Sequence, residues 1–313
     1  MRSNKRLTAL IVGFGSIGKR HAANLRKLGI RDIIFLRHAK RGQLPADHVA
    51  GIAAALARKP DFAVIANPTS LHVPIAERLA RAGVHLFIEK PLSHSMAGVP
   101  ELLRTARRKK LTTMVGYNFR FHPQLARMKE LLGRGAVGRV VSARVEVGQY
   151  LPDWHPGEDY RKGYAARKAL GGGVILTLIH EIDYLLWLLG KPEAVFCFAD
   201  RLSDLKIDVE DVAEILIQFR GGAVGAVHLD YIQHAPSRSA QIIGTKGTMH
   251  WDYFKGELRM YSAKTKKWTV YRDPTNFDRN RMFLDEMKQF LACVRGGKQT
   301  AISLSEGLTS LRT

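Results

Sequence analysis

The chain has 313 residues, 46% of them hydrophobic, which suits a globular protein with two domains of ordinary size. Its 49 basic and 28 acidic residues give a charge of +21, but the basic residues lie in scattered short groups, so a basic surface explains them at least as well as a nucleic-acid partner. The chain has two cysteines, which are far apart and in no metal or redox spacing, so a disulfide framework is excluded and a cytoplasmic protein is predicted. No long apolar segment is free of charged residues, so a membrane span is not expected.

The first predicted element is a buried strand that leads into a glycine-rich turn. The apolar run Leu7–Val12 is followed by Gly13-Phe14-Gly15-Ser16-Ile17-Gly18 and by a helix over residues 17–28. Gly13 would permit the tight turn, Gly15 would let a phosphate approach the backbone, and Gly18 would let the helix pack on the strand. Since the N–H groups of a first helical turn attract anions, this order predicts a site for the pyrophosphate of a dinucleotide.

The same alternation of strands and helices continues to about residue 120. Further strands are predicted at Asp32–Leu36, Phe62–Ala66, His85–Ile88 and Thr112–Val115. Helices are predicted between them, at Ala46–Ala57, Val73–Ala82 and Met96–Lys109. Right-handed crossovers turn such a pattern into a doubly wound parallel sheet, so residues 1–120 are predicted to form a nucleotide-binding domain of the α/β class.

From residue 121 to 313 the pattern changes to that of an α+β domain. A helix at Pro123–Leu132 precedes a strand at Val140–Val147, and a second helix follows Gly173. Seven further strands with alternating apolar residues are predicted at Val195–Ala199, Ala213–Phe219, Ala223–Tyr231, Ser239–Gly244, Thr248–Tyr253, Leu258–Tyr261 and Trp268–Tyr271. Strands joined by short turns predict a largely antiparallel sheet with helices on one face.

Polar residues follow three predicted strands of the first domain. Arg37 ends the second strand, where an arginine favours the 2′-phosphate of NADP over the ribose hydroxyls of NAD. Asn67-Pro68-Thr69 and His72 follow the third strand, and Glu89-Lys90-Pro91 follows the fourth. Because parallel strands end at one edge of the sheet, and open sheets bind ligands there, these residues are predicted to line the cofactor site.

These motifs belong to a longer series that continues with Gly116 to His122, Gly171-Gly172-Gly173 and His180-Glu181-Ile182-Asp183. The series resembles the Gfo/Idh/MocA oxidoreductases, a family named for glucose-fructose oxidoreductase and inositol dehydrogenase, over almost the whole chain. The resemblance implies a Rossmann domain, a second domain with an open sheet, and hydride transfer between NAD(P) and a secondary alcohol or ketone of a sugar or cyclitol. It also implies a homodimer or homotetramer formed through that sheet.

The resemblance implies roles for single residues as well. Lys90 matches the lysine that contacts substrate and nicotinamide, and His180 matches the histidine usually proposed as general acid/base. Asn118 is expected to contact both cofactor and substrate, and Arg120 is expected to contact the substrate.

The helix after Gly173 supports a role for His180 independently, although a packing histidine is the alternative. Its apolar residues are predicted to form a buried stripe, with Thr177, His180 and Asp183 on the other side. An imidazole exchanges protons near neutral pH, and Asp183 could orient it. Many family members carry an aspartate three or four residues before this histidine, where this chain has Leu176 and Thr177. Thr177 can hydrogen-bond a hydroxyl but cannot act as a base.

The loop before the triple glycine carries aromatic and basic residues. Trp154 and Tyr164 suit stacking on a sugar ring, and Arg167 and Lys168 suit binding of a carboxylate or phosphate. A dimer contact or an ordinary surface loop explains them equally well. A metal site on the helix that carries His180 is not expected, because adjacent helix positions point apart.

We therefore expect an oxidoreductase that uses NADP in preference to NAD and acts on a sugar derivative, acidic and nucleotide-linked sugars included. Neither nucleic acid nor a membrane is an expected partner. Two alternatives stay open. The charge of +21 and the missing aspartate suit a cofactor-binding regulator or scaffold, and the same two-domain plan suits a reductase of an imine or linear tetrapyrrole.

Overall fold

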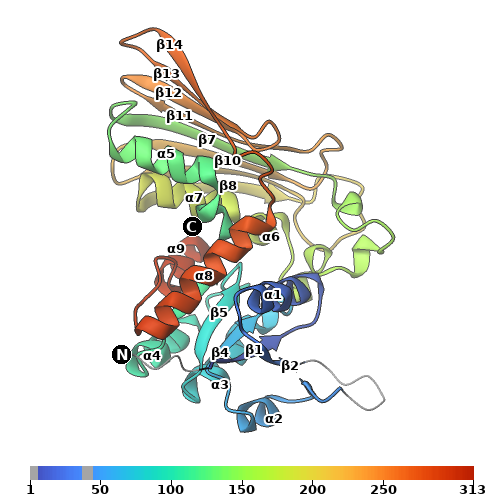
Figure 1. The fold of residues 1–313 in the computed structure, drawn as a ribbon. Coiled ribbons are helices and arrows are strands. Elements are labelled where there is room, and N and C mark those ends of the chain that lie inside the picture. The colour runs from blue at the N-terminus through green and yellow to red at the C-terminus, as the bar shows by residue number, and fades with distance from the viewer. Residues whose placement is uncertain (1–5, 37–44) are drawn as a thin grey trace. The chain divides into compact units, whose positions relative to one another are not determined.

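The computed structural model describes residues 6–36 and 45–313, which form two units (Figure 1). The first unit extends to Tyr117 and also contains Asn280–Arg312, and the second comprises Asn118–Arg279. The predicted boundary near residue 120 lies close to the first transition, but the prediction assigned every later residue to the second domain. The structure differs because helices α8 (Asn280–Gly296) and α9 (Leu304–Arg312) pack on strand β6 (Thr113–Gly116) of the first unit.

A parallel sheet of six strands in the order β3-β2-β1-β4-β5-β6 forms the centre of the first unit. The other strands are β1 (Thr8–Val12), β2 (Asp32–Leu36), β3 (His48–Val49), β4 (Phe62–Ile65) and β5 (His85–Glu89). Strands β1, β4 and β5 are almost wholly buried, as their continuous apolar sequences predict. The strand order reverses between β1 and β4, at the kind of switch point where open α/β sheets bind ligands.

Helices pack in pairs around this sheet. Helix α1 (Ser16–Lys27) contacts α8, and α3 (His72–Arg81) contacts α4 (Val99–Arg108). The helix predicted over Ala46–Ala57 is wrong in its first half, where the chain forms β3 before α2 (Ile52–Ala57). His48 pairs with Phe35 at the edge of the sheet, and Gly51 caps α2 with extended backbone, so strand pairing takes the residues of the expected first turns.

The second unit contains an eight-stranded sheet in the order β14-β13-β12-β11-β7-β10-β9-β8. Its strands are β7 (Val140–Gly148), β8 (Pro192–Asp200), β9 (Val212–Phe219), β10 (Val224–Asp230), β11 (Ser237–Gly244), β12 (Gly247–Asp252), β13 (Glu257–Ser262) and β14 (Lys267–Arg272). Strands β7 and β10 are parallel, and the other neighbouring pairs are antiparallel. The prediction of a large, mostly antiparallel sheet is confirmed.

Helices cover one face of this sheet. They are α5 (Pro123–Gly133), α6 (Val174–Thr177) and α7 (His180–Leu189), with α7 against β7 and β10 and α6 against β9 and β10. Along β7 the residues Ala143 and Val145 are buried while Arg144 and Glu146 are exposed, as the alternation of the sequence predicts.

The helix expected after Gly173 differs from the prediction in two ways. It is broken into α6 and α7, and the predicted polar side is absent, since His180, Asp183 and Tyr184 are as buried as their apolar neighbours. Among residues 6–36 and 45–313, no single helix has the length and apolar composition to cross a membrane. The segments Lys168–Thr177 and His180–Leu189 meet that test of length and composition only as a pair, which bends by 47°.

Candidate functional site

The turn between β1 and α1 is shaped by glycines at its two ends. Gly13 has a φ of 97°, and a Cβ there would lie 2.7 Å from the carbonyl oxygen of Ala66. A Cβ on Gly18 would collide with the carbonyl oxygen of Gly13. Gly15 is exposed, and a Cβ there would meet no atom of the described residues within 4 Å. Packing of the protein therefore requires glycine at positions 13 and 18, whereas Gly15 leaves open space beside the backbone.

Helix α1 offers its N-terminus at the same turn. The helix begins at Ser16 with Gly15 as N-cap, and within the described chain no side chain caps its first turn. The first N–H groups of a helix have no partner within it, and with the positive end of the helix dipole they attract an anion. The ring of Phe14 packs edge-on against Phe35 and His48, at 5.1 Å between centroids in both cases. The turn thus fits the pyrophosphate of a dinucleotide.

Three of the predicted segments lie at one edge of the parallel sheet. Strands β1, β4 and β5 are neighbours and run in the same direction, so the segments that follow them share an edge. These segments are the glycine turn, Asn67–Thr69 and Lys90. Arg37, the predicted selector of the 2′-phosphate, lies outside the described residues, and its role stays a prediction.

His72 joins two of these segments. Its Nδ1 lies 2.9 Å from the carbonyl oxygen of Pro91, and its Nε2 lies 2.9 Å from that of Asn67. Burial lowers the pKa of His72, against the opposite effect of the two carbonyl groups. Both ring nitrogens contact carbonyl oxygens of the protein, so His72 holds the two loops together, and its predicted contact with the cofactor stays a prediction.

Lys90 follows the last residue of β5 and is half-buried. The peptide bond between Lys90 and Pro91 is cis. The backbone N–H of Lys90 donates to Oε2 of Glu89 at 3.2 Å. Glu89 is itself buried, so its carboxylate holds the backbone from which the lysine side chain extends.

In the second unit, His180 is the first residue of α7. Its side chain is 7% exposed, and its ring centroid lies 4.9 Å from that of Phe119. The start of α7 therefore places the imidazole beside the segment that leaves the first unit, in which Asn118 and Arg120 also lie.

Asp183, which was predicted to orient His180, forms a buried ion pair with Arg120, and its role toward His180 stays a prediction. Its Oδ2 accepts from Nε of Arg120 at 2.9 Å, and its Oδ1 accepts from Nη2 at 2.8 Å. Both side chains are buried, so this is a two-point ion pair between a guanidinium and a carboxylate. The charge of Arg120 is thus matched by Asp183 inside the protein, and its predicted contact with the substrate stays a prediction.

A second buried ion pair on α7 escaped the sequence analysis. Glu181 Oε1 lies 2.9 Å from Nε of Arg238, and the guanidinium of Arg238 lies over the ring of Phe119 at 4.3 Å. The two residues are far apart in sequence, and the sequence analysis did not single out Arg238. Periodicity could not have found this contact, because the pairing of β11 with β7 creates it.

Two family models match the two units in turn. Residues 7–117 match a model described as an oxidoreductase family with an NAD-binding Rossmann fold, and residues 125–250 match the C-terminal domain of the Gfo/Idh/MocA family. The chain belongs to the Gfo/Idh/MocA oxidoreductase family. The resemblance inferred from the sequence is confirmed, and the first unit is the family's NAD-binding domain.

Relatives in this family cover the chain to different extents. A levoglucosan dehydrogenase of Pseudarthrobacter phenanthrenivorans is 30% identical over 251 residues, which are 69% of this chain and 64% of that protein. A myo-inositol 2-dehydrogenase of Thermotoga maritima is 24% identical over 329 residues, with 96% and 92% covered. A solved levoglucosan dehydrogenase in complex with NADH and levoglucosan has a TM-score of 0.86 at 21% identity, covering 98% of this chain and 95% of that one, and shows that the fold is shared.

The loop before the triple glycine gives this family member two accessible side chains. Tyr164 is 38% exposed and Arg167 is exposed, and their contact with a substrate stays a prediction. Trp154 is half-buried: its indole N–H donates to the carbonyl oxygen of Gln149 at 3.3 Å, and its ring lies 5.4 Å from that of Tyr231. Contacts within the protein therefore occupy part of the Trp154 side chain, and its role toward a substrate stays a prediction.

Packing within the second unit requires glycine at positions 172 and 173 of the triple glycine. A Cβ on Gly172 would lie 2.6 Å from the carbonyl oxygen of Ala165, and a Cβ on Gly173 would collide with the carboxylate of Glu210. The same carboxylate accepts from the N–H of Ile175 at 3.2 Å and so caps α6. The glycines let this loop close onto the start of α6.

Asn118 and Thr177 are buried in the second unit. Asn118 is 2% exposed, and its Oδ1 has no hydrogen-bond partner among the described residues. Thr177 is 3% exposed and lies on α6. An amide oxygen without a protein partner suits the expected contact of Asn118 with a ligand.

Proposed function

We propose that the protein transfers a hydride between a nicotinamide dinucleotide and a secondary alcohol or ketone carbon of a sugar derivative or cyclitol. The observation that carries the proposal is the shared sheet edge of the glycine turn and Lys90. Gly15 leaves space for phosphates there, and the strand order puts Lys90 on the side where the rest of the cofactor would extend. When bound, the nicotinamide ring supplies the hydride acceptor or donor.

The protein contributes charge and a proton carrier. The ammonium group of Lys90 polarises the oxygen of the reacting carbon and stabilises the negative charge that develops on it. His180 takes the hydroxyl proton in oxidation and returns it in reduction. Because Thr177 stands where many family members carry an aspartate, the proposal assigns the proton chemistry to Lys90 and His180.

The substrate class in the proposal follows from the relatives and from charge. One relative is named as a dehydrogenase of levoglucosan and another of myo-inositol, both polyhydroxylated rings. The net charge of +21, with Arg167 and Lys168 near the exposed loop, favours derivatives that carry a carboxylate or phosphate. Absorbance of the reduced cofactor should be followed with both NAD and NADP against inositols, sugar acids, nucleotide sugars and amino sugars. Failure of every polyol with either cofactor would contradict the proposal.

The cofactor proposal includes a preference for NADP, which rests on Arg37. In that case Arg37→Ser should lower kcat/KM for NADP at least about tenfold while leaving kcat/KM for NAD within about twofold, as expected for loss of one charge-assisted contact. The ratio of the two kcat/KM values measures this directly. A wild-type protein that prefers NAD would remove the role given to Arg37.

We also propose a homo-oligomer formed through the open sheet of the second unit. The face away from α5 and α7 carries exposed apolar side chains: Phe196 is 69% exposed, Phe198 54% and Leu216 50%. Phe196 and Leu216 are cross-strand partners, so they lie on one side of the sheet. An apolar patch of this kind on a sheet face is typical of a protein interface.

A further inference from the structure

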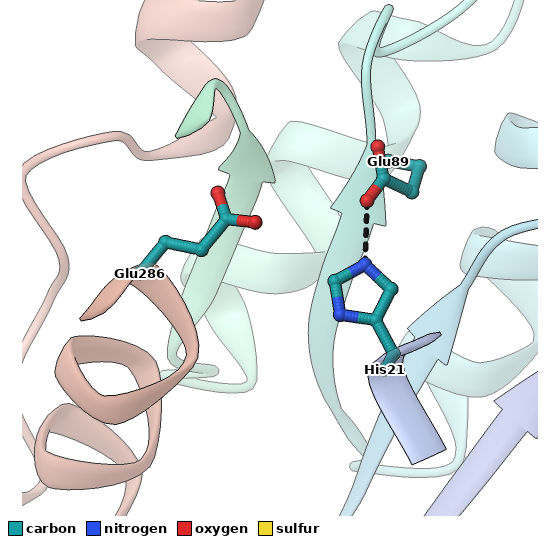
Figure 2. A group of neighbouring side chains, drawn as sticks. All are labelled: His21, Glu89 and Glu286. Carbon is teal, nitrogen blue, oxygen red and sulfur yellow. Dashed lines mark hydrogen bonds and ion pairs between the residues drawn. The ribbon is translucent and has the colours of Figure 1, made fainter. Parts of the chain in front are cut away.

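A buried cluster of titratable side chains lies behind the Lys90 turn, wholly within the first unit. His21 comes from α1, Glu89 from the end of β5 and Glu286 from α8 (Figure 2). His21 and Glu286 are fully buried, and Glu89 is 8% exposed. One nitrogen or carboxylate oxygen from each lies within 4.8 Å of one from each of the others. The proposed function assigns no role to His21 or Glu286.

Glu89 is held on three sides by the protein. His21 Nε2 donates to its Oε1 at 2.5 Å, and the backbone N–H of Lys90 donates to its Oε2 at 3.2 Å. Gly116 leaves room for the carboxylate, since a Cβ there would lie 3.3 Å from both oxygens. Displacement of the Glu89 carboxylate would therefore move the backbone at Lys90, from which the ammonium group extends.

Glu286 faces this arrangement without a partner of its own. Figure 2 shows its carboxyl group directed from α8 toward Glu89 and His21. Neither of its oxygens has a hydrogen-bond partner among the described residues. Burial, reinforced by the charge of Glu89, raises the pKa of Glu286 well above its usual range. A charged carboxylate in this position would repel Glu89, whereas a neutral acid offers an O–H donor beside it.

A bound metal ion fits the cluster less well than a proton. Two ligands of a tetrahedral zinc ion at bond lengths near 2.0–2.1 Å lie roughly 3.3 Å apart. The 2.5 Å between His21 Nε2 and Glu89 Oε1 is shorter than that and is a hydrogen-bond distance. The donor set of one imidazole and two carboxyls nevertheless makes metal analysis part of the test.

We propose that Glu286 is a positioning residue which completes the buried His21–Glu89–Glu286 cluster and so fixes the backbone that presents Lys90. This inference rests on the proposed function of Lys90. It places a residue of the C-terminal segment, far from the nucleotide-binding motifs in sequence, behind the reacting group. Glutamine is neutral and has nearly the same shape as a protonated glutamate, so it should preserve the function of Glu286. Leucine fills the same space but has no hydrogen-bond donor, so it should not.

The test compares three variants of the full chain, Glu286→Gln, Glu286→Leu and Asp285→Leu. Asp285 is the matched control, because it is the next residue on α8 and pairs at the surface with Arg281. Glu286→Leu should lose roughly 10- to 100-fold in kcat, as expected when a reacting group shifts by about 1 Å, with the dissociation constant of the cofactor changed less than about threefold. Glu286→Gln and Asp285→Leu should keep kcat within about twofold.

Three results would overturn the inference. The first is that Glu286→Leu has the same kcat as the wild type, and the second is that Glu286→Gln is as impaired as Glu286→Leu. The third is that the purified wild type contains a stoichiometric metal which the Glu286→Gln variant lacks. Lys90→Ala, measured in parallel, separates this inference from the proposed function. Full turnover by Lys90→Ala contradicts the proposed function itself, whereas a loss of turnover there together with a fully active Glu286→Leu contradicts only the positioning role.

Discussion

Asp183 illustrates how a buried charge is neutralised in this protein. Its carboxylate and the guanidinium of Arg120 are almost without solvent exposure, and two hydrogen bonds join them. Removing one partner of such a pair leaves the other as an uncompensated charge in the interior. The residue predicted as an aid to catalysis is thus first a support that ties α7 to the segment after Tyr117.

Asp183→Asn should therefore lower the free energy of unfolding by about 3–5 kcal/mol. Urea unfolding measures this loss. The surface carboxylate of Asp285 provides a comparison, since Asp285→Asn removes a half-exposed ion pair and should cost less than about 1 kcal/mol. Equal effects of the two changes would show that burial of the Arg120–Asp183 pair does not matter for stability.

His228 carries a second prediction at this scale, because two carboxylates flank its ring. Its Nε2 donates to Asp230 Oδ2 at 3.0 Å and its Nδ1 donates to Glu214 Oε1 at 2.6 Å. The hydrogen bond to Asp230 is the main cause that raises the pKa of His228 to about 9, against desolvation by burial, which lowers it. The imidazole is therefore charged in the folded protein at neutral pH.

A raised pKa stabilises the fold below the pKa of the unfolded chain, near 6.5, and this stabilisation is lost as the pH rises through about 9. The free energy of unfolding of the wild type minus that of His228→Gln should be constant below about pH 6.5 and shrink toward about pH 9. Denaturant unfolding across that range gives the difference. A titration of the His228 ring near pH 6.5, seen by NMR, would contradict the prediction.

Motifs that act locally could be predicted from the sequence, and contacts between distant segments could not. The glycine turn, Asn67–Thr69 and Lys90 each follow a strand within a few residues, so their placement at one edge required only a parallel sheet. The ion pair of Asp183 with Arg120 and the proximity of Glu286 to His21 and Glu89 were beyond prediction, because each joins elements that only the fold brings together.

At the scale of elements, substitutions of two glycines in the turn between β1 and α1 can separate an effect on protein packing from an effect on cofactor binding. Gly18→Ala pushes a methyl group into the carbonyl of Gly13 and should cost about 1–3 kcal/mol of stability. Gly15→Ala meets no described atom and should change stability by less than about 1 kcal/mol, the size of an N-cap effect. The same Gly15→Ala variant should weaken cofactor binding at least about tenfold, which calorimetry measures. Tight cofactor binding by Gly15→Ala would contradict the site.

Helix α8 was missed although its sequence contains the signal. Its buried residues include Met282, Phe283, Glu286, Met287 and Phe290, which recur at helical spacing. Glu286 interrupts the apolar pattern, and its burial depends on the cluster that it joins in the first unit. The break between α6 and α7 had no such signal, because the segment reads as one continuous apolar helix.

For the whole molecule, the fold class could be predicted from the sequence, but the packing of the C-terminal segment on the first unit could not. Fold class and both sheet types followed from the change between continuous and alternating apolar runs. The sequence did not predict that Asn280–Arg312 belongs to the first unit, because α8 and α9 pack on β6, which is far from them in sequence. Oligomer formation through the second sheet was predicted only through the family resemblance.

Oligomer formation through that face can be tested in solution. Leu216→Lys places a charge among Phe196 and Phe198 while Ile215 and Ile217 keep the buried side of β9 intact. Light scattering after gel filtration should find a dimer or tetramer for the wild type and a smaller species for the variant. A monomeric wild type, or an unchanged mass for Leu216→Lys, would contradict the proposed interface.

The central claim is that Lys90 acts on the substrate at the edge where the cofactor binds. Single-turnover measurement of cofactor reduction or oxidation by Lys90→Ala, with cofactor affinity determined on the same sample, tests it most directly. We predict a rate lowered on the order of 10²- to 10³-fold, the usual effect of removing an electrostatic stabiliser, with cofactor affinity within about threefold of the wild type. A wild-type rate in Lys90→Ala would contradict the account.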